Sequence, residues 1–316
     1  MSVYGLKQQF TDRAENKKGN SKSKSNKSDR INEEFVPRVV NGWPAKLGDV
    51  PYQVAFKALT SHVFSRYVTF CGGTIIAPAK ILSAAHCFVE DRSACVRFFT
   101  NTGRVRHKEL LHKYAVAGTL RNQGVKPFSD STDEGQWRQL RDVFYPKVFK
   151  FPIEDIAVVM TKTPFHYTAY VNYLPYARRF ADYAGSCLVS GYGRITSTGT
   201  AKSDRLLLAH LVIVPVRPCS IQHRRNMKHF VCTSSRVTDV GKGDSGGPLV
   251  CKGTGEPHES SRGILVGIVS GHRYGVGSFF TRVSSYHGYI ESNKSNCINN
   301  KLLFVYLIIM HGFLPF

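Results

Sequence analysis

Short apolar runs, broken by glycine, proline and asparagine, dominate the chain from Pro51 onward and restrict the folds that it can adopt. Residues 52–59 and 68–76 are two such runs, and each has the length and composition of a single strand. Stretches with a long helical periodicity are scarce. The pattern therefore predicts an all-β fold.

The segment Gly-Asp-Ser-Gly-Gly-Pro at residues 243–248 carries the strongest chemical signal. A serine hydroxyl becomes a useful nucleophile only when a base takes its proton and N–H donors hold the oxyanion that forms. The glycines let the backbone come close to a substrate carbonyl. Ser245 is therefore the candidate nucleophile, and the N–H groups of Gly243 and Ser245 are the candidate oxyanion donors. An ordinary glycine-rich turn is the alternative.

A fitting histidine and a fitting acid occur upstream of this turn. His86 lies in Ser-Ala-Ala-His-Cys, and Asp155 opens the β-branched run Asp-Ile-Ala-Val-Val-Met. A buried acid holds an imidazole in one tautomer and stabilises the imidazolium. Either residue alone is more often structural, and the chain has 12 histidines. Together with Ser245, they predict nucleophilic acyl transfer.

With these three segments in the order His, Asp, Ser, the chain resembles the trypsin/chymotrypsin-like serine proteases over residues 39–298. The resemblance implies two six-stranded antiparallel β-barrels with the active site between them. It also implies a short C-terminal helix within residues 283–298, whereas residues 299–316 would lie beyond the protease domain.

The resemblance also implies a role for each motif residue. His86 would act as general base and then acid, Asp155 would orient it, and Ser245 would be the nucleophile. Ser270, in Gly-Ile-Val-Ser, would lie beside the acid and the substrate backbone. Neither a cofactor nor a metal is implied, because Glu109 alone cannot supply the several oxygen ligands that calcium takes.

The segment Val-Pro-Arg-Val-Val around Arg38 resembles the activation junction of the family's zymogens. Residues 1–38 are polar, basic and low in complexity, so we expect a disordered propeptide. Cleavage after Arg38 would free the amine of Val39, which in the family pairs with the acid before the nucleophile, here Asp244. An ordinary basic turn ahead of a strand is the alternative.

The specificity pocket is the part of the predicted site that departs most from the family. Asp239 stands where trypsin-like members carry the pocket acid, which predicts cleavage after Arg or Lys. However, Gly241 replaces a usual cysteine, Ser278 replaces a usual glycine, and the loop 271–276 is short and lacks a usual tryptophan. An exposed Asp239 without a ligand is the competing interpretation.

Eight cysteines indicate disulfides, an oxidising compartment and therefore a secreted protein. The resemblance implies three pairs: Cys71 with Cys87, Cys187 with Cys251, and Cys219 with Cys232. Cys95 and Cys297 remain, and they either pair with each other or stay free. Asn26 and Asn293 are weak candidate glycosylation acceptors.

The two ends of the chain fit this interpretation poorly. No apolar signal segment is visible at the start, which conflicts with the cysteines, so we expect the start to be incomplete. The apolar run 302–310 is shorter than the about 20 residues that span a bilayer. It is either a membrane-contacting tail or, as we prefer, a non-native end.

The formal net charge of +21 points to anionic partners, such as a sulfated glycan. Residues 104–113 and 217–229 concentrate the cations. A generally basic solvated surface is the simpler alternative, and no nucleic-acid motif accompanies the charge. The other expected partners are a protein or peptide substrate and an activating protease.

The interval between His86 and Asp155 is long for the family, so we expect an insertion within residues 101–134 that forms an exposed loop. The leading hypothesis is a secreted serine endopeptidase made as a zymogen. The alternative is a catalytically inactive homologue that serves as a binding or regulatory module.

Overall fold

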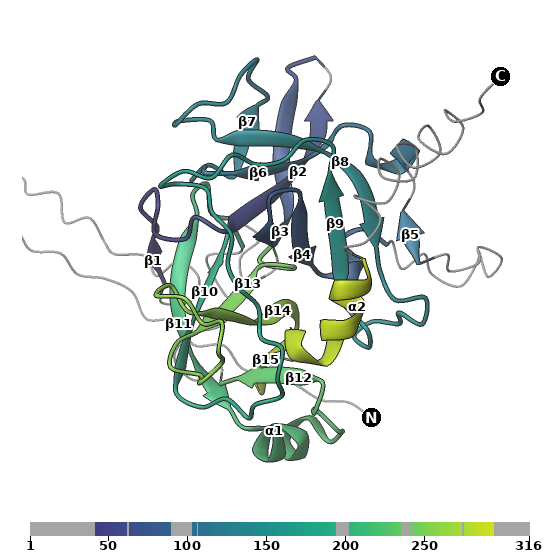
Figure 1. Ribbon diagram of the computed structural model, residues 1–316, viewed down its shortest axis with the longest axis vertical. Helices are drawn as coiled ribbons and strands as arrows, with labels where there is room; N and C mark the ends of the chain where they lie inside the picture. Colours follow the sequence, from purple (N-terminus) through teal and green to yellow (C-terminus); the bar gives the residue numbers. More distant parts are fainter. Residues whose placement is uncertain are drawn as a thin grey trace, which may run out of the picture. The chain divides into compact units, whose positions relative to one another are not determined.

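The computed structural model describes residues 42–61, 63–89, 103–105, 107–193, 202–234, 240–241, 243–273 and 275–293 (Figure 1). The predictions for Arg38, Val39, Asp239, Cys95 and Cys297 fall outside the described residues. The propeptide and the apolar tail also fall outside them.

The first barrel is a closed antiparallel sheet with the strand order β2-β6-β8-β9-β4-β3, closed by pairing of β3 with β2. Its strands are β2 (Gln53–Ser61), β3 (Arg66–Ala77), β4 (Lys80–Ser83), β6 (Lys113–Ala117), β8 (Gln136–Phe144) and β9 (Ala157–Thr161). Two short strands add to its rim: β5 (Arg104–Val105) pairs with β8, and β7 (Gln123–Val125) pairs with β3.

The second barrel has the order β11-β10-β13-β14-β15-β12, and pairing of β12 with β11 closes it. Its strands are β10 (Ser186–Gly191), β11 (Leu207–Val214), β12 (Phe230–Thr233), β13 (Pro248–Cys251), β14 (Ile264–Arg273) and β15 (Gly277–Arg282). The short strand β1 (Trp43–Pro44) pairs with β11. Each barrel therefore closes with six strands, and the predicted fold class is confirmed.

Helices are few in the described part of the chain. The α-helices are α1 (Val216–His223) and α2 (His287–Ser292), and the 3-10 helices are η1 (Ala85–Cys87), η2 (His107–Leu110) and η3 (Val283–Tyr286). The C-terminal helix α2 follows η3, and both lie within the interval 283–298, so the predicted short C-terminal helix is confirmed. No helix among the described residues is long and apolar enough to cross a membrane.

Each barrel has its own core, and a further core joins the two. Strand β11 shows how the sequence builds these cores, because buried Leu211 and Ile213 alternate with exposed His210 and Val212. The joining core brings side chains of the first barrel, such as Leu82 and Val158, against side chains of the second. Those of the second barrel include Leu208, Val250, Leu265 and Ile268. The seam between the barrels is therefore closely packed.

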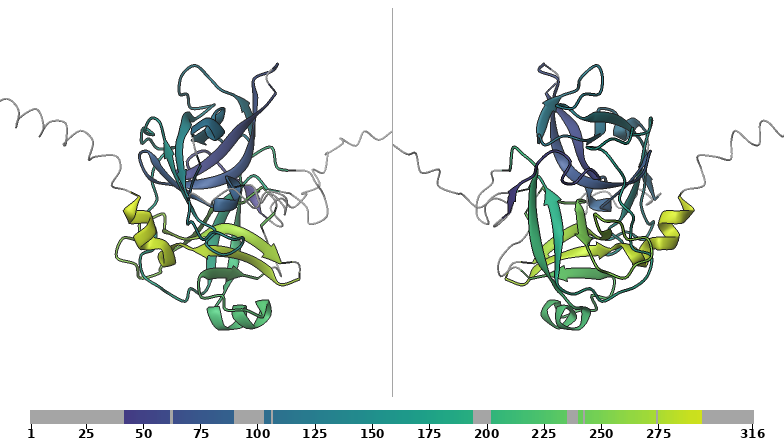
Figure 2. Two further views of the ribbon diagram at one scale, coloured as in Figure 1. Left: turned by 90° about the vertical axis from the view of Figure 1, so that its right-hand side faces the viewer. Right: turned by 60° about the vertical axis from the view of Figure 1, so that its left-hand side comes forward.

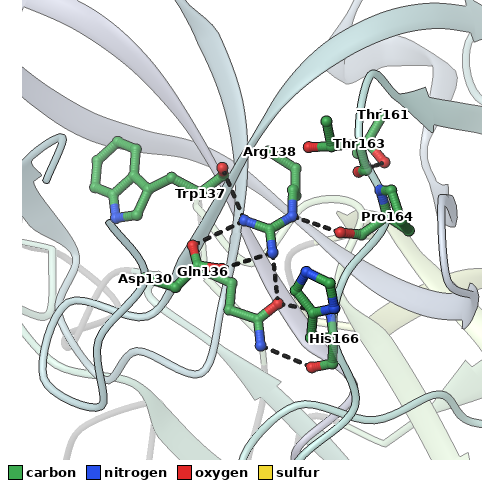
Figure 3. A network of polar contacts seen from close by, with 8 residues as sticks. All are labelled: Asp130, Gln136, Trp137, Arg138, Thr161, Thr163, Pro164 and His166. Atoms are coloured by element: carbon green, nitrogen blue, oxygen red, sulfur yellow. Dashed lines mark hydrogen bonds and ion pairs between the residues drawn. The ribbon is translucent and has the colours of Figure 1, made fainter. Parts of the chain in front are cut away.

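The interval in which an insertion was expected is mostly built into the first barrel, where it forms β5, η2, β6 and β7. Its exposed part is the loop between β7 and β8, residues 126–135, and Phe128 is fully exposed there. Arg138 of β8 holds this loop (Figure 3). Its guanidinium donates to both carboxylate oxygens of Asp130, at 2.8 and 2.7 Å, and to the Pro164 carbonyl at 2.6 Å.

Candidate active site

His86 and Asp155 meet because the strands that carry them pair. Strands β4 and β9 run antiparallel with Ser83 opposite Ala157, so the residues just after β4 and just before β9 lie at the same end of the barrel. Asp155 is fully buried. Its Oδ2 lies 2.8 Å from Nδ1 of His86, and its Oδ1 accepts the backbone N–H of His86 at 2.9 Å. The carboxylate therefore fixes both the position and the orientation of the imidazole.

The second barrel also contributes to this carboxylate. Ser270, on β14, donates its hydroxyl to Oδ2 of Asp155 at 2.5 Å. Thr281, on β15, donates its hydroxyl to the Asp155 carbonyl at 2.7 Å. Asp155 thus accepts hydrogen bonds from both barrels, and its position depends on their mutual packing.

The turn that carries Ser245 lies against the first barrel although it leads into β13 of the second. The Ser245 carbonyl accepts the N–H of Gly72 at 2.7 Å. A Cβ at Gly246, where φ is +76°, would come within 2.3 Å of the Ser83 hydroxyl oxygen, so glycine is required there. Ser245 is half-buried, beside the segment that leads from Ser83 to His86.

Two backbone N–H groups near this serine are available to a ligand. Within the described part of the chain, neither Gly243 nor Ser245 donates its N–H to an acceptor. Gly243 has a φ of +114°, which L side chains rarely adopt. Among the same residues, the Ser245 hydroxyl has no hydrogen bond to His86. Catalytic hydrogen bonds are often loose in the absence of substrate.

Asp244 is buried in a cradle of glycines. One of its carboxylate oxygens accepts the N–H of Gly193 at 2.7 Å, and the other accepts the N–H of Gly241 at 2.9 Å. A Cβ at Gly191 would lie 2.0 Å from Oδ1 of Asp244, and one at Gly193 would lie 2.3 Å from Oδ2. The segment around Gly191 therefore uses glycine because the carboxylate occupies the space of a side chain.

The imidazole of His86 has one open side. Its side chain is 24% exposed. The exposed ring of Phe151 stands edge-on to it, with 5.5 Å between the ring centroids. The backbone behind His86 is anchored by the disulfide between Cys87 and Cys71 of β3. An incoming group can therefore reach the ring from the solvent side, past Phe151.

The described positions at which the sequence departs from the family pattern of the pocket include Gly271 on β14 and Ser278 on β15. Ser278 is fully buried on β15, and its hydroxyl oxygen lies 3.3 Å from Nδ1 of His272 on β14. Gly271 lies under the ring of Phe279, because a Cβ added there would come within 2.4 Å of that ring. An aromatic ring from β15 thus covers the position of the missing tryptophan.

Disulfides join three cysteine pairs in the described chain: Cys71 with Cys87, Cys187 with Cys251, and Cys219 with Cys232. Two clusters of potential metal ligands each contain one of these pairs, with His86 in one cluster and His223 in the other. Their cysteines are oxidised and offer no thiolate to a metal.

Sequence reasoning missed several residues of the site. Thr281 and Phe151 lie in segments that carry no motif, so nothing in the sequence indicated their contacts. The Gly191-Tyr192-Gly193 segment, which surrounds Asp244, was not assigned to the site either. The pair of nearby glycines was the available signal, since glycine within a strand often marks a close approach.

Comparison with known proteins places this fold and site in a family. The family model described as Trypsin matches residues 39–290. The chain belongs to this family, and the resemblance inferred from its motifs is confirmed.

The similar proteins are distant relatives within that family. Ovochymase of Halocynthia roretzi is 26% identical over 276 residues, which are 84% of this chain but only 16% of ovochymase, so the chain spans a small part of that relative. Trypsin of Xenopus laevis is 26% identical over 82% of this chain and 91% of its own length. Chymotrypsin-2 of Vespa crabro is 28% identical over 81% of this chain and 100% of its own length. Similarity alone thus does not choose between trypsin and chymotrypsin specificity.

Proposed function

We propose that the protein is a serine endopeptidase with Ser245 as nucleophile, His86 as general base and acid, and Asp155 as the orienting acid. The observation that carries this proposal is the bond between Asp155 Oδ2 and His86 Nδ1 at 2.8 Å. A proton held on Nδ1 by the carboxylate leaves the lone pair of Nε2 free to accept the proton of a serine.

The reaction follows from these positions. Nε2 of His86 takes the proton of Ser245 while Oγ attacks the substrate carbonyl carbon, and the oxyanion accepts the N–H groups of Gly243 and Ser245. His86 then gives the proton to the leaving amine as the peptide bond breaks, which leaves an acyl-enzyme. Water then attacks the acyl carbon while His86 takes its proton, and His86 returns that proton to Oγ of Ser245 as the ester bond breaks and the acid product leaves. Only neutral imidazole can act as the base in these two steps.

We further propose that the chain is a zymogen activated by cleavage after Arg38. Asp244 supports this proposal, because it is 1% exposed and is held by two N–H groups near the candidate oxyanion donors. We expect an amine released at Val39 to form an ion pair with this buried carboxylate. Pairing would then couple cleavage to the shape of the Gly243–Ser245 backbone.

A fluorophosphonate probe tests the chemistry and the activation together. We expect covalent labelling of Ser245 in the full chain after cleavage at Arg38, and little labelling before cleavage. Ser245→Ala and Arg38→Gln, treated with the same protease, should both stay unlabelled. If cut, folded protein fails to label, the inactive binding module becomes the better hypothesis. The departures from the family pattern at Gly271 and Ser278 are the observation that favours this alternative.

The proposed preference is for cleavage after Arg or Lys, with Asp239 as the pocket acid. A guanidinium can bind a carboxylate through two parallel hydrogen bonds. Cut enzyme should therefore hydrolyse an Arg-site peptide about 100-fold faster in kcat/KM than the matched Tyr-site peptide. Asp239→Asn should remove most of that difference and leave fluorophosphonate labelling in place. A faster cut at the Tyr site would contradict the assignment.

The proposed setting is outside the cell, where disulfides persist. The three disulfides of the described chain support it. Membership of the trypsin family makes proteins or peptides the expected substrates. The further partners that we propose are an activating protease that cuts at Arg38 and an anionic glycan.

A further inference from the structure

We propose that a basic surface around α1 on the second barrel is the binding site for a sulfated glycan chain. We use the name α1 basic face for the cations on α1, on the turn after it and on the segment 178–182, which contacts Val216 and Arg282; they are Arg178, Arg179, Arg217, Arg224, Arg225 and Lys228. All six side chains belong to exposed residues. The sequence indicated only those in the run 217–229, because Arg178 and Arg179 lie far from that run along the chain.

A buried arginine joins the two parts of the α1 basic face. Arg282 is 1% exposed. Its guanidinium donates to the carbonyls of Lys228 at 2.9 Å and Phe230 at 2.8 Å, and also to the carbonyl of Ala181. The segment that follows Arg179 is therefore fixed against the segment that contains Lys228.

Further contacts make this surface rigid. The backbone N–H at the start of α1, on Val216, donates to Oδ1 of Asp182 at 2.9 Å. Arg282 and Lys228 both lie over the ring of Phe180, at 4.7 and 5.9 Å from its centroid. These contacts fix the backbone that carries the cations, so less backbone entropy is lost when a chain binds there.

The positive charge of this face is little compensated. Among the described residues, no ion pair engages any of its six cations. Of the acids nearby, Asp182 accepts the Val216 N–H. Glu256 is buried and accepts the backbone N–H groups of Arg178 and Arg179. Asp182 and Glu256 keep their negative charges, and Arg178 also contacts Nε2 of His258 at 3.3 Å, but the six cations outnumber these two acids and an external anion can still pair with them.

The other basic run, residues 104–113, is a poorer candidate. Arg104 is paired with Asp142 at 2.5 Å and lies over the ring of Phe144. The run also contains the exposed Glu109, whereas the run 217–229 contains no acidic residue. Structure therefore separates two runs that look alike in sequence.

The chemistry of the α1 basic face fits sulfates better than other anionic partners. Five of its six cations are arginines, whose planar guanidinium binds oxyanions through two parallel hydrogen bonds. A membrane needs an apolar face to insert, yet on the eight-residue α1 only Ile221 is a large apolar residue with an exposed side chain. Single-stranded nucleic acid is bound by stacking of its bases on aromatic rings, and the ring of Phe180 is already in contact with Lys228 and Arg282.

The place of α1 keeps this surface apart from the candidate active site. Figures 1 and 2 show α1 at the end of the second barrel that is remote from the first barrel. The candidate active site, in contrast, contains residues of both barrels. A glycan chain could therefore be bound while the active site stays open to substrate.

Binding of a heparin-derived octasaccharide to the full chain tests the proposal. Calorimetry over a range of salt concentrations should show that Arg217→Gln/Arg225→Gln/Lys228→Gln weakens binding about tenfold or more and lowers the salt slope by about 2 to 3. The matched control Lys108→Gln/Lys150→Gln/Lys162→Gln removes the same charge from exposed positions on the first barrel. It should change affinity less than about twofold. Unchanged thermal unfolding would show that both variants are folded.

Equal weakening in the two triple variants would overturn the site and leave a generally basic surface. The choice of ligand would be overturned if the protein bound phosphatidylserine vesicles or single-stranded DNA more tightly than the octasaccharide, and if only the α1 triple variant lost that binding. The inference deepens the proposed partner and does not depend on peptidase activity. Fluorophosphonate labelling of the same variants, cut at Arg38, separates a failed binding site from a failed peptidase.

Discussion

At the scale of single residues, the buried carboxylate of Asp244 requires glycine at two neighbouring positions. Its oxygens occupy the space where Gly191 and Gly193 would carry a Cβ, at 2.0 and 2.3 Å. Contacts under 3.0 Å cannot be relieved without movement of one partner. If the carboxylate moved, the hydrogen bonds that it accepts from the N–H groups of Gly193 and Gly241 would be lost or lengthened.

We therefore expect Gly191→Ala to displace Asp244, to lower the free energy of unfolding by about 1–3 kcal/mol, and to reduce fluorophosphonate labelling sharply. Gly288→Ala is the matched control, because nothing lies within 4 Å of its added Cβ in α2. That change should raise the free energy of unfolding by about 0.5–1 kcal/mol and leave labelling intact. Normal labelling of Gly191→Ala would contradict the role given to Asp244.

At this scale, the sequence identified the site residues that lie in short recognisable motifs. His86, Asp155, Ser245 and Ser270 each lie in a distinctive short segment, and the structure brings these segments together. Thr281 could not be found in this way, since a single hydroxyl in a strand carries no local signal. Its contact with Asp155 depends on a fold that joins residues far apart along the chain.

At the scale of elements, the loop between β7 and β8 is ordered by charge and not by apolar packing. Arg138 is 6% exposed, and Asp130 reaches it from the loop through two hydrogen bonds (Figure 3). These bonds from Arg138 hold the pKa of Asp130 below its usual value. The folded state therefore binds the proton of Asp130 less readily than the unfolded state does, so this pair stabilises the fold above the ordinary aspartate pKa of about 3.9.

Asp130→Asn should accordingly lower the free energy of unfolding by about 1 kcal/mol at neutral pH, a modest value because the carboxylate is partly exposed. The difference from the parent protein should shrink as pH falls through the folded pKa of Asp130, where the parent loses the same charge. Asp133→Asn, in the same loop and exposed, is the control and should have little effect. Denaturant unfolding of the three proteins from pH 3 to pH 7 would measure both effects. A difference that stays constant with pH would contradict the ion-pair explanation.

Sequence patterns were a better guide to strands than to helix limits. The runs 52–59 and 68–76 fall almost entirely within β2 and β3, since alternation and β-branching are local properties. The resemblance placed a short C-terminal helix within residues 283–298, and η3 and α2 lie there, but it did not give the point at which the 3-10 helix passes into the α-helix. Helix ends depend on capping and tertiary contacts, which a short apolar pattern does not encode.

At the scale of the whole molecule, the two barrels share a core that neither could bury alone. Leu82 and Val158 of the first barrel join Leu208 and Leu265 of the second in one buried cluster. Hydrogen bonds cross the same seam, such as the one from Ser190 Oγ to Gln53 Oε1 at 2.5 Å. Separation of the barrels would expose this apolar surface to water.

We therefore expect the two barrels to unfold together. The chain has two tryptophans: Trp43 on β1, which pairs with β11, and Trp137 on β8 of the first barrel. Trp43→Phe and Trp137→Phe each leave one reporter, so the fluorescence of each variant follows one barrel. In both variants, a midpoint of thermal unfolding measured by fluorescence that equals the midpoint measured by circular dichroism would support one transition. Two separate midpoints within one variant would contradict it.

The convergence of both barrels on Asp155 also has a consequence for the order of synthesis. A ribosome makes the chain from its first residue, and the hydrogen bonds to Asp155 come from His86, Ser270 and Thr281. A nascent chain that ends before Thr281 lacks the last of these donors, even when the first barrel is complete. The acid can reach its final environment only after almost the whole described chain has been translated. The architecture thus delays completion of the site until late in translation.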